Sequence, residues 1–256
     1  MGAVSTIRSA ANPALKRVRA ALAGREPGLA VLEGDRLIAD ARAAGLAFEL
    51  LLLADDRDPA ELAPLEARPV ERGLLQGVSR LRTSPGSLAL VRAPRPRPLS
   101  DLELGGEPLL AVAAGIADPG NLGALARTAE AAGSGALVVV GGGCSPWNEK
   151  ALRGSMGSLL RLPVCLAPAA APAAAELARR GFRQVRAATR GGVPLERFDW
   201  SGSVALWLAS ETGALPPEAA GLEGVSIPMA GAAESLNVGA AAAVLLFAAG
   251  RNRERA

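Results

Sequence analysis

Two polar segments of this 256-residue sequence carry side chains that could do chemistry, although they lie far apart along the chain. They are residues 118–129 and 227–238, and in each a proline-containing turn leads from an apolar run into a stretch of helix formers. Backbone amides at the start of a helix are free to hold a ligand. The two segments therefore predict one ligand site built from distant parts of the chain. Its candidate side chains are Asn121, Arg127, Ser235 and Asn237.

The sequence contains no histidine and no tyrosine. This excludes Ser-His-Asp triads, Cys-His nucleophiles and histidine-containing zinc motifs. Cys144 and Cys165 are isolated, so no metal site is expected. Two lone cysteines and the lack of a charged-then-apolar leader favour a cytoplasmic location over secretion. The apolar run 238–249 is shorter than the roughly 20 residues that span a bilayer, so we expect a core helix there and no membrane contact.

Basic residues are concentrated in the first part of the chain. Residues 1–98 carry 15 Lys and Arg against 11 Asp and Glu, whereas the remainder carries 13 against 14. Guanidinium groups suit bidentate contacts with phosphate, so this excess favours an RNA partner. From charge alone, a general solvated surface is an equally good explanation. The residues expected to contact RNA are Arg8, Lys16, Arg17, Arg19 and Arg153.

A proline-rich stretch divides the sequence into two parts. From Pro94 to Pro98 every second residue is proline, which prevents both helix and central strand. We expect a substrate-binding domain over 1–92, a semi-rigid linker over 93–108 and a second domain over 109–256. Short strands that alternate with helices predict a small α/β sandwich for the first domain. Its expected helices are 12–23 and 35–44, the first of them capped by Asn12. Its expected strands are 29–33 and 48–53.

The second domain alternates apolar strands with helices more clearly. Apolar strands flanked by helices predict a mostly parallel sheet that is covered on both faces. Ligands of such sheets bind beyond the carboxyl ends of the strands, where both polar segments and Gly141 fall. The expected strands are 109–116, 136–140, 162–166, 184–188, 204–209 and 224–227, and the expected helices are 123–132, 149–160 and 173–180.

Each candidate side chain also has a purely structural explanation. Arg127 fits an ordinary surface charge, and Glu211 follows a strand end, where it caps the chain or contacts ligand hydroxyls. The glycines at 141–143 lack the GxGxxG spacing of a dinucleotide loop. Taken one by one, these residues do not define a site. Helix N-capping alone would explain Asn121, Ser235 and Asn237.

The order and spacing of three motifs resemble the SpoU/TrmH-type methyltransferases of the SPOUT superfamily. This resemblance covers about residues 109–250, and it implies methyl transfer from S-adenosylmethionine to a ribose 2′-hydroxyl of RNA. Residues 9–15 and 32–34 also resemble the ribosomal-protein-like RNA-binding domain that precedes the catalytic domain in rRNA-modifying members. The three motifs are 118–124 with 127–129 (DPGNLGA and RTA), 148–150 with 153–157 (NEK and RGSMG), and 227–229 with 235–238 (IPM and SLNV).

The resemblance extends to the fold and the assembly. It implies an α/β protein whose second domain contains a deep trefoil knot, formed where the C-terminal segment passes under a preceding loop. Knots are nearly absent from proteins, so nothing in the composition predicts one. A homodimer is implied as well, with the last helix and the helix of the first motif at its interface. The two-domain layout favours large-subunit rRNA over tRNA as the substrate.

The site residues also follow from the resemblance. Arg127 would be the catalytic residue, and Glu211 would contact the cofactor or orient Arg127. Arginine is always protonated in proteins, so we expect Arg127 to stabilise the developing alkoxide rather than to act as a base. Asn121, Ser235 and Asn237 would shape the site. The cofactor would be held by backbone groups at Ala209, Ile227 and Leu236, with Met229 and Gly141 beside them.

Two departures from the family pattern bear on cofactor affinity. The loop 209–214 lacks the glycine-rich sequence that is usual in the family, and Gly239 stands where serine is common. A non-catalytic RNA-binding protein that keeps the fold is therefore the alternative function. A nucleotide-dependent oxidoreductase would need a glycine-rich fingerprint and a downstream acidic residue, which the sequence does not contain.

Overall fold

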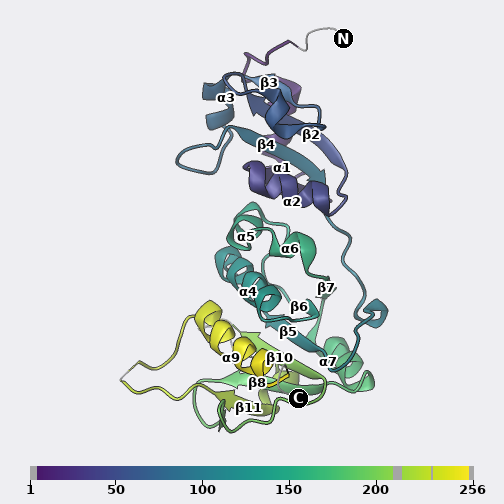
Figure 1. Ribbon diagram of the computed structural model, residues 1–256, viewed down its shortest axis with the longest axis vertical. Helices are drawn as coiled ribbons and strands as arrows, with labels where there is room; N and C mark the ends of the chain where they lie inside the picture. Colours follow the sequence, from purple (N-terminus) through teal and green to yellow (C-terminus); the bar gives the residue numbers. More distant parts are fainter. Residues whose placement is uncertain (1–4, 210–214, 232, 254–256) are drawn as a thin grey trace. The chain divides into compact units, whose positions relative to one another are not determined.

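The computed structural model describes residues 5–209, 215–231 and 233–253, and the chain forms two compact units (Figure 1). The first unit contains the residues up to Pro94 together with Trp147–Arg161, and the second contains Arg95–Pro146 and the residues from Leu162 onwards. The division near Pro94 falls in the proline-rich stretch. The inclusion of 147–161 in the first unit has no counterpart in the sequence pattern.

The first unit is built on a four-stranded mixed sheet with the order β1-β4-β2-β3. Strands β1 and β2 run antiparallel to β4, and β3 runs parallel to β2. The Asn12 side chain accepts a hydrogen bond from the Ala14 amide, which confirms the predicted cap. In chain order the elements are α1 (Pro13–Leu22), β1 (Leu29–Glu33), α2 (Asp35–Ala43), β2 (Phe48–Ala54), η1 (Pro59–Leu62), β3 (Arg68–Val70), α3 (Arg72–Gln76), β4 (Ser87–Arg92), α5 (Glu149–Gly154) and α6 (Ser158–Arg161).

The continuous helix predicted over 149–160 is wrong, because the chain breaks between α5 and α6. Met156 and Gly157 have positive φ values of 50° and 86°, which end α5. A Cβ atom on Gly157 would lie 2.1 Å from Oδ2 of Asp40 in α2. The same carboxylate pairs with Arg161 of α6 at 3.2 Å. The break therefore lets the backbone approach a carboxylate that sits more than a hundred positions earlier in the sequence.

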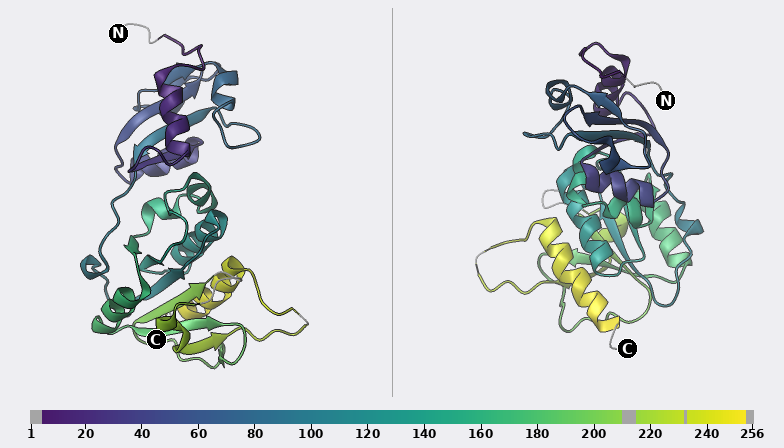
Figure 2. Two further views of the ribbon diagram at one scale, coloured as in Figure 1. Left: turned by 180° about the vertical axis from the view of Figure 1, so that it is seen from behind. Right: turned by 45° about the horizontal axis from the view of Figure 1, so that its top comes forward.

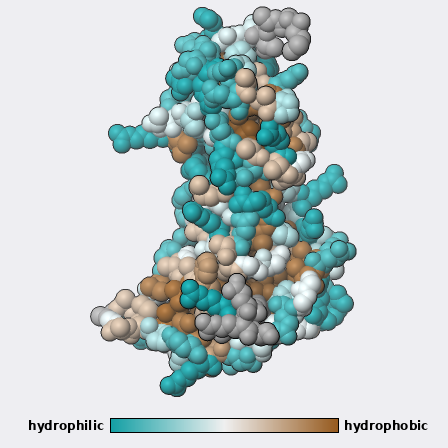
Figure 3. Space-filling view, viewed as in Figure 1, coloured by the Kyte–Doolittle hydropathy of each residue, from teal (hydrophilic) through white to brown (hydrophobic). Residues whose placement is uncertain are grey.

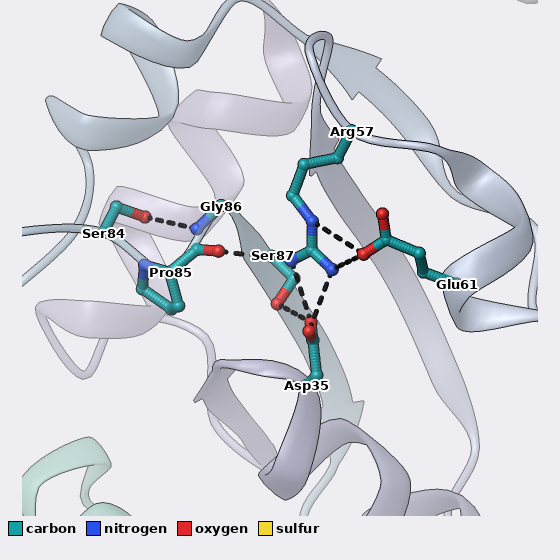
Figure 4. Close-up of polar contacts among 7 residues, drawn as sticks. All are labelled: Asp35, Arg57, Glu61, Ser84, Pro85, Gly86 and Ser87. Carbon is teal, nitrogen blue, oxygen red and sulfur yellow. Dashed lines mark hydrogen bonds and ion pairs between the residues drawn. The ribbon is translucent and has the colours of Figure 1, made fainter.

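Arg57 is the centre of a polar network in the first unit (Figure 4). Its guanidinium donates to Oδ1 and Oδ2 of Asp35 at 3.0 and 2.9 Å, to the Glu61 carboxylate, and to the Pro85 carbonyl at 3.2 Å. Ser87 Oγ donates to Oδ1 of Asp35 at 2.5 Å. The Arg57 side chain is only 14% exposed, so its charge needs these acidic partners. The hydrogen bonds from Arg57 lower the pKa of Asp35. Through its bond with Ser87, the Asp35 side chain also connects the start of α2 with the start of β4.

Replacing Asp35 with asparagine should lower the free energy of unfolding by about 1 kcal/mol at pH 7, since the Asp35 carboxylate is half exposed. Because the folded-state pKa of Asp35 lies below its unfolded value, the ionised group stabilises the fold above about pH 4. That contribution is lost as the pH falls through the lowered pKa. Urea unfolding between pH 7 and pH 2.5 should show that the free energy of unfolding falls less steeply with decreasing pH for Asp35→Asn than for wild type. Glu66→Gln, which neutralises an exposed carboxylate, is the control, and equal slopes for Asp35→Asn and wild type would contradict the prediction.

The second unit is built on a seven-stranded sheet with the order β7-β6-β5-β10-β8-β11-β9. Every pairing in it is parallel, which confirms the predicted α/β class, and the six expected strands are present. In chain order the elements are η2 (Leu99–Asp101), β5 (Leu109–Ala114), α4 (Pro119–Ala131), β6 (Ala136–Val140), β7 (Val164–Ala167), α7 (Ala170–Arg179), β8 (Arg183–Ala188), β9 (Val193–Pro194), β10 (Val204–Ala209), α8 (Pro217–Ala220), β11 (Glu223–Ser226) and α9 (Val238–Arg253).

Helices cover both faces of this sheet, which explains why β5 and β6 are buried along their whole length. Val112 and Trp207, which pair across β5 and β10, share one core cluster with Leu177 of α7. Helices α4 and α9 lie side by side and contact β5 (Figures 1 and 2). The parallel sheet is thus held between α7 with α8 and α4 with α9.

The segment predicted as a linker packs on the second unit. The Arg97 amide donates to the carbonyl of Val164, the first residue of the edge strand β7, at 3.2 Å. Leu102 is buried in the core cluster, and the Arg180 guanidinium donates to the Leu99 and Leu102 carbonyls. The prolines keep the chain extended only as far as Pro98, where η2 begins.

The trefoil knot implied by the resemblance stays a prediction. A knot depends on the complete path of the chain, and residues 210–214 and 232 lie outside the described residues.

Helix α9, which was expected to be a core helix, has 16 residues. Across the ranges that the structure describes, there is no helix with the length and apolar character needed to cross a membrane.

Candidate active site

A cavity of about 580 Å³ lies at the carboxyl ends of three neighbouring strands of the parallel sheet, β10, β8 and β11, and at the start of α9. Ligands of parallel sheets bind at such ends. The volume is in the range of small-molecule sites, which is about 300–1,000 Å³. The cavity contains four of the five predicted cofactor residues and one predicted site residue, which are Ala209, Ile227, Met229, Leu236 and Ser235.

The lining combines apolar side chains with charged ones. Ala209, Ile227 and Leu236 are half-buried, and Leu208 and Val238 behind them are buried. An apolar slot at strand ends, where backbone groups are accessible, fits the adenosine part of S-adenosylmethionine. The charged lining residues are Arg186, Arg190 and Glu234. Both charge signs are therefore available to the zwitterionic end of that cofactor.

The first and third motifs meet through two asparagines. Asn237 Nδ2 donates to Asn121 Oδ1 at 3.1 Å, and Asn237 Oδ1 accepts from the Gly239 amide at 2.9 Å. Asn237 thus caps α9, as predicted. The capping prediction for Asn121 is wrong, because Asp118 is the N-cap of α4 and its Oδ1 accepts from the Asn121 amide at 2.9 Å. The Asn121 side chain is instead directed at the third motif.

Gly239, the departure from the family's serine, has a packing role. A Cβ atom there would lie 3.1 Å from Asn237 Oδ1 and 3.3 Å from the Ala124 Cβ. These distances are tight, so a larger residue would push α9 away from α4. Glycine at this position therefore keeps the two motifs close.

Arg127 lies on α4, six residues beyond Asn121, and its side chain is exposed. Six residues of α-helix rise about 9 Å and turn the side chain to another face. Arg127 is not part of the cavity lining. Its exposure suits a residue that meets a substrate arriving from solvent. Glu211, its predicted orienting partner, lies outside the described residues.

Gly141 does not line the cavity, and in its glycine-rich loop close backbone packing accounts for the glycine at position 143. A Cβ atom on Gly143 would lie 2.7 Å from the Ile116 carbonyl oxygen. The Cys144 amide donates to that same oxygen at 2.9 Å. The loop after β6 is therefore fitted against the loop after β5.

Cys165 is poorly suited to act as a nucleophile. Cys165 is buried, and this burial raises the pKa of its thiol to about 11. Thiolate is therefore scarce at neutral pH. Within the described part of the chain there is no group of three or more cysteine and acidic side chains that could hold a metal ion.

The predicted RNA-contacting residues all belong to the first unit, Arg153 included. Arg8 and Lys16 are exposed. Arg17 pairs with Glu49 at 3.0 Å, and Arg153 pairs with Glu149 in the same helix. Arg19 donates to a backbone carbonyl at 2.9 Å. Arg8 and Lys16 are therefore better placed than Arg17 to reach phosphate.

Sequence reasoning missed the charged residues of the cavity. Arg190 follows the end of β8 by two residues, and Glu234 precedes α9 by four. In the sequence, Arg190 was marked only by its position just after a strand end, and Glu234 by its place in the polar segment 227–238 just before a helix. No motif contains them.

Comparisons with known proteins place the chain in one family. The SpoU rRNA Methylase family model matches residues 108–247. One relative is the 23S rRNA (guanosine(2553)-2'-O)-methyltransferase RlmP of Bacillus subtilis, 30% identical over 223 residues, which cover 85% of this chain and 86% of that protein.

Two solved structures resemble the whole chain. A crystal structure of an RNA 2'-O ribose methyltransferase gives a TM-score of 0.83 at 31% identity, covering 98% of this chain and 100% of that one. An AdoMet-bound rRNA methyltransferase from Sinorhizobium meliloti gives 0.83 at 26% identity, covering 98% of each chain. Because the family model spans more than half of the sequence and the Bacillus relative aligns over most of it, this chain belongs to the SpoU rRNA methylase family, as predicted.

Proposed function

We propose that this chain transfers the methyl group of S-adenosylmethionine to a guanosine 2′-hydroxyl of 23S rRNA. The cavity at the ends of β8, β10 and β11 carries the proposal, because Ala209, Ile227 and Leu236 line it as a cofactor site would require. The relatives support the substrate, since RlmP is named for a guanosine of 23S rRNA. The AdoMet-bound Sinorhizobium structure supports the cofactor. An rRNA substrate also supports a cytoplasmic location.

The cofactor supplies an already activated methyl group, so the protein mainly has to position the attacking oxygen. Backbone groups at Ala209, Ile227 and Leu236 would hold the adenosine. The hydrogen-bonded pair of Asn121 and Asn237 would hold the start of α4 against the start of α9, next to the lining residues Leu236 and Val238. Ser235, on the lining, would contribute a hydroxyl there.

Arg127 would act on the RNA rather than on the cofactor. Arginine carries a guanidinium cation, so Arg127 can stabilise the developing 2′-alkoxide and bind the adjacent phosphate. The proton of the hydroxyl would pass to water, to a phosphate or to Glu211. The first unit would bind the surrounding rRNA through exposed cations such as Arg8 and Lys16.

Radiolabelled S-adenosylmethionine and unmethylated 23S rRNA test this function. We expect methyl label in one guanosine, at a ribose that resists alkaline cleavage. Label on a base, or no label at all, would overturn the proposal. Calorimetry with S-adenosylmethionine addresses the alternative function, since RNA binding without cofactor binding would indicate a non-catalytic RNA-binding protein.

We also propose that two copies associate through α9 and α4. Val244 and Phe247 of α9 are 40% and 43% exposed, and apolar surface gathers around this helix (Figure 3). Ala240, Ala243 and Ala248, which flank the pair on the same helix and are not buried, allow close approach of a second helix. Exposed apolar patches of this kind mark protein interfaces.

The double substitution Val244→Glu and Phe247→Glu should convert the dimer to monomer, because it would bury four like charges in the dimer interface. Light scattering after size-exclusion chromatography measures the mass. Leu166→Glu, at a residue 42% exposed on β7, is the matched control and should leave the dimer intact. A monomeric wild type, or a dimeric double variant, would contradict the proposed interface.

A further inference from the structure

Two oppositely charged side chains face each other across the lining of the cavity. Arg190, from the loop after β8, and Glu234, from the segment before α9, both line it. Arg190 Nη2 lies 3.7 Å from Glu234 Oε1, and the side chains are 80% and 86% exposed. They come from two different loops and meet where the cavity opens to solvent.

This pair contributes little to stability. At 3.7 Å the atoms are beyond hydrogen-bond distance, and exposed ion pairs contribute about 0–1 kcal/mol. The loop of Arg190 is positioned by its backbone instead. A Cβ atom on Gly192 would lie 2.7 Å from the Gly224 carbonyl oxygen, so this loop fits closely against β11. The backbone therefore places Arg190 at the cavity, while its guanidinium keeps its donors available.

The third charged lining residue is already engaged. Arg186 is half-buried, and its Nε donates to the Leu222 carbonyl at 3.1 Å. Arg190 and Glu234 are thus the lining charges best able to exchange partners. A ligand with one negative and one positive group, a short distance apart, matches them.

We propose that Arg190 and Glu234 together bind the amino-acid end of the cofactor, with Arg190 contacting the α-carboxylate and Glu234 the α-ammonium. This inference rests on the proposed function, because it assumes S-adenosylmethionine in the cavity. The two side chains pair with each other without the cofactor and with its zwitterion when it is bound. Each charge stays paired in both states, and each new contact is a charge-assisted hydrogen bond.

Calorimetry on the full chain with two ligands tests the pair. S-adenosylhomocysteine carries the amino-acid end, and 5′-methylthioadenosine lacks it. Arg190→Gln and Glu234→Gln should each weaken binding of S-adenosylhomocysteine by about tenfold and leave binding of methylthioadenosine unchanged. Arg179→Gln, which removes an exposed ion pair on α7, is the matched control and should bind both ligands as wild type does.

The outcomes separate the inference from the proposed function. Unchanged affinity for S-adenosylhomocysteine in both variants would overturn the inference. An equal loss for both ligands would also overturn it, since that would indicate a change in the shape of the cavity. A wild-type chain that binds neither S-adenosylmethionine nor S-adenosylhomocysteine would instead overturn the proposed function.

Discussion

Replacing Arg127 with alanine should lower the rate of methyl transfer by about a hundred- to a thousandfold, the cost of removing one group that stabilises a developing oxyanion. The affinity for S-adenosylhomocysteine should stay unchanged, because Arg127 does not line the cavity. The fold should also be unaffected. The Arg127 side chain is exposed and makes no hydrogen bond or ion pair with any residue that the structure describes.

Single-turnover rates with 23S rRNA and calorimetry with S-adenosylhomocysteine measure the two effects separately. Arg127→Lys shows what the charge alone achieves. A lysine variant that keeps most of the rate would show that a positive charge suffices, which would remove support for arginine as a base. Arg179→Ala serves as the control. An Arg127→Ala variant with the wild-type rate would remove Arg127 from the proposed mechanism.

Replacing Gly250 with alanine should destabilise the second unit by about 1–3 kcal/mol, the usual cost of inserting a methyl group into a packed interface. The added Cβ would lie 2.8 Å from the Ala132 carbonyl oxygen at the end of α4. One of the two helices has to move, because the contact is with backbone. Since Asn237 caps α9, the shift should also disturb its bond to Asn121 and lower the rate of methyl transfer.

Urea unfolding measures the stability. Gly73→Ala is the matched control, since Gly73 also lies in a helix, α3, but has nothing within 4 Å of its added Cβ. That change should be neutral or stabilise by up to about 1 kcal/mol, through the lower entropy of the unfolded chain. If Gly250→Ala were as stable as Gly73→Ala, α4 and α9 would not pack as closely as described.

Long apolar strands were the most predictable part of this fold. Strands β1, β6 and β10 have the predicted ends, because each is a mainly apolar run bounded by glycine or polar residues. The apolar strand β4 was missed although it lies in the middle of the first sheet, and so were the short strands β3 and β9. Three and two residues show no periodicity, and pairing with neighbouring strands stabilises them instead. The break at Gly157 was missed because it depends on Asp40, a tertiary contact.

The residues of the site also fall into a group that was predictable from the sequence and a group that was not. The motifs led to Ala209, Ile227 and Leu236, which do line the cavity. Arg190 and Glu234 could not be found in the sequence, because an exposed charge in a loop looks like any surface charge. They differ from other surface charges only because the fold brings their two loops to the same cavity.

The contact between the loops after β5 and β6 has a consequence for evolution. The three glycines at 141–143 look identical in the sequence, yet mutation should affect each differently. Gly141 has φ 75° with open space around its Cβ direction, so asparagine should be accepted. Gly142 has open space and no positive φ, so most substitutions should be tolerated at this position. Gly143 lies against the Ile116 carbonyl, and purifying selection should retain glycine there for as long as the two loops stay in contact.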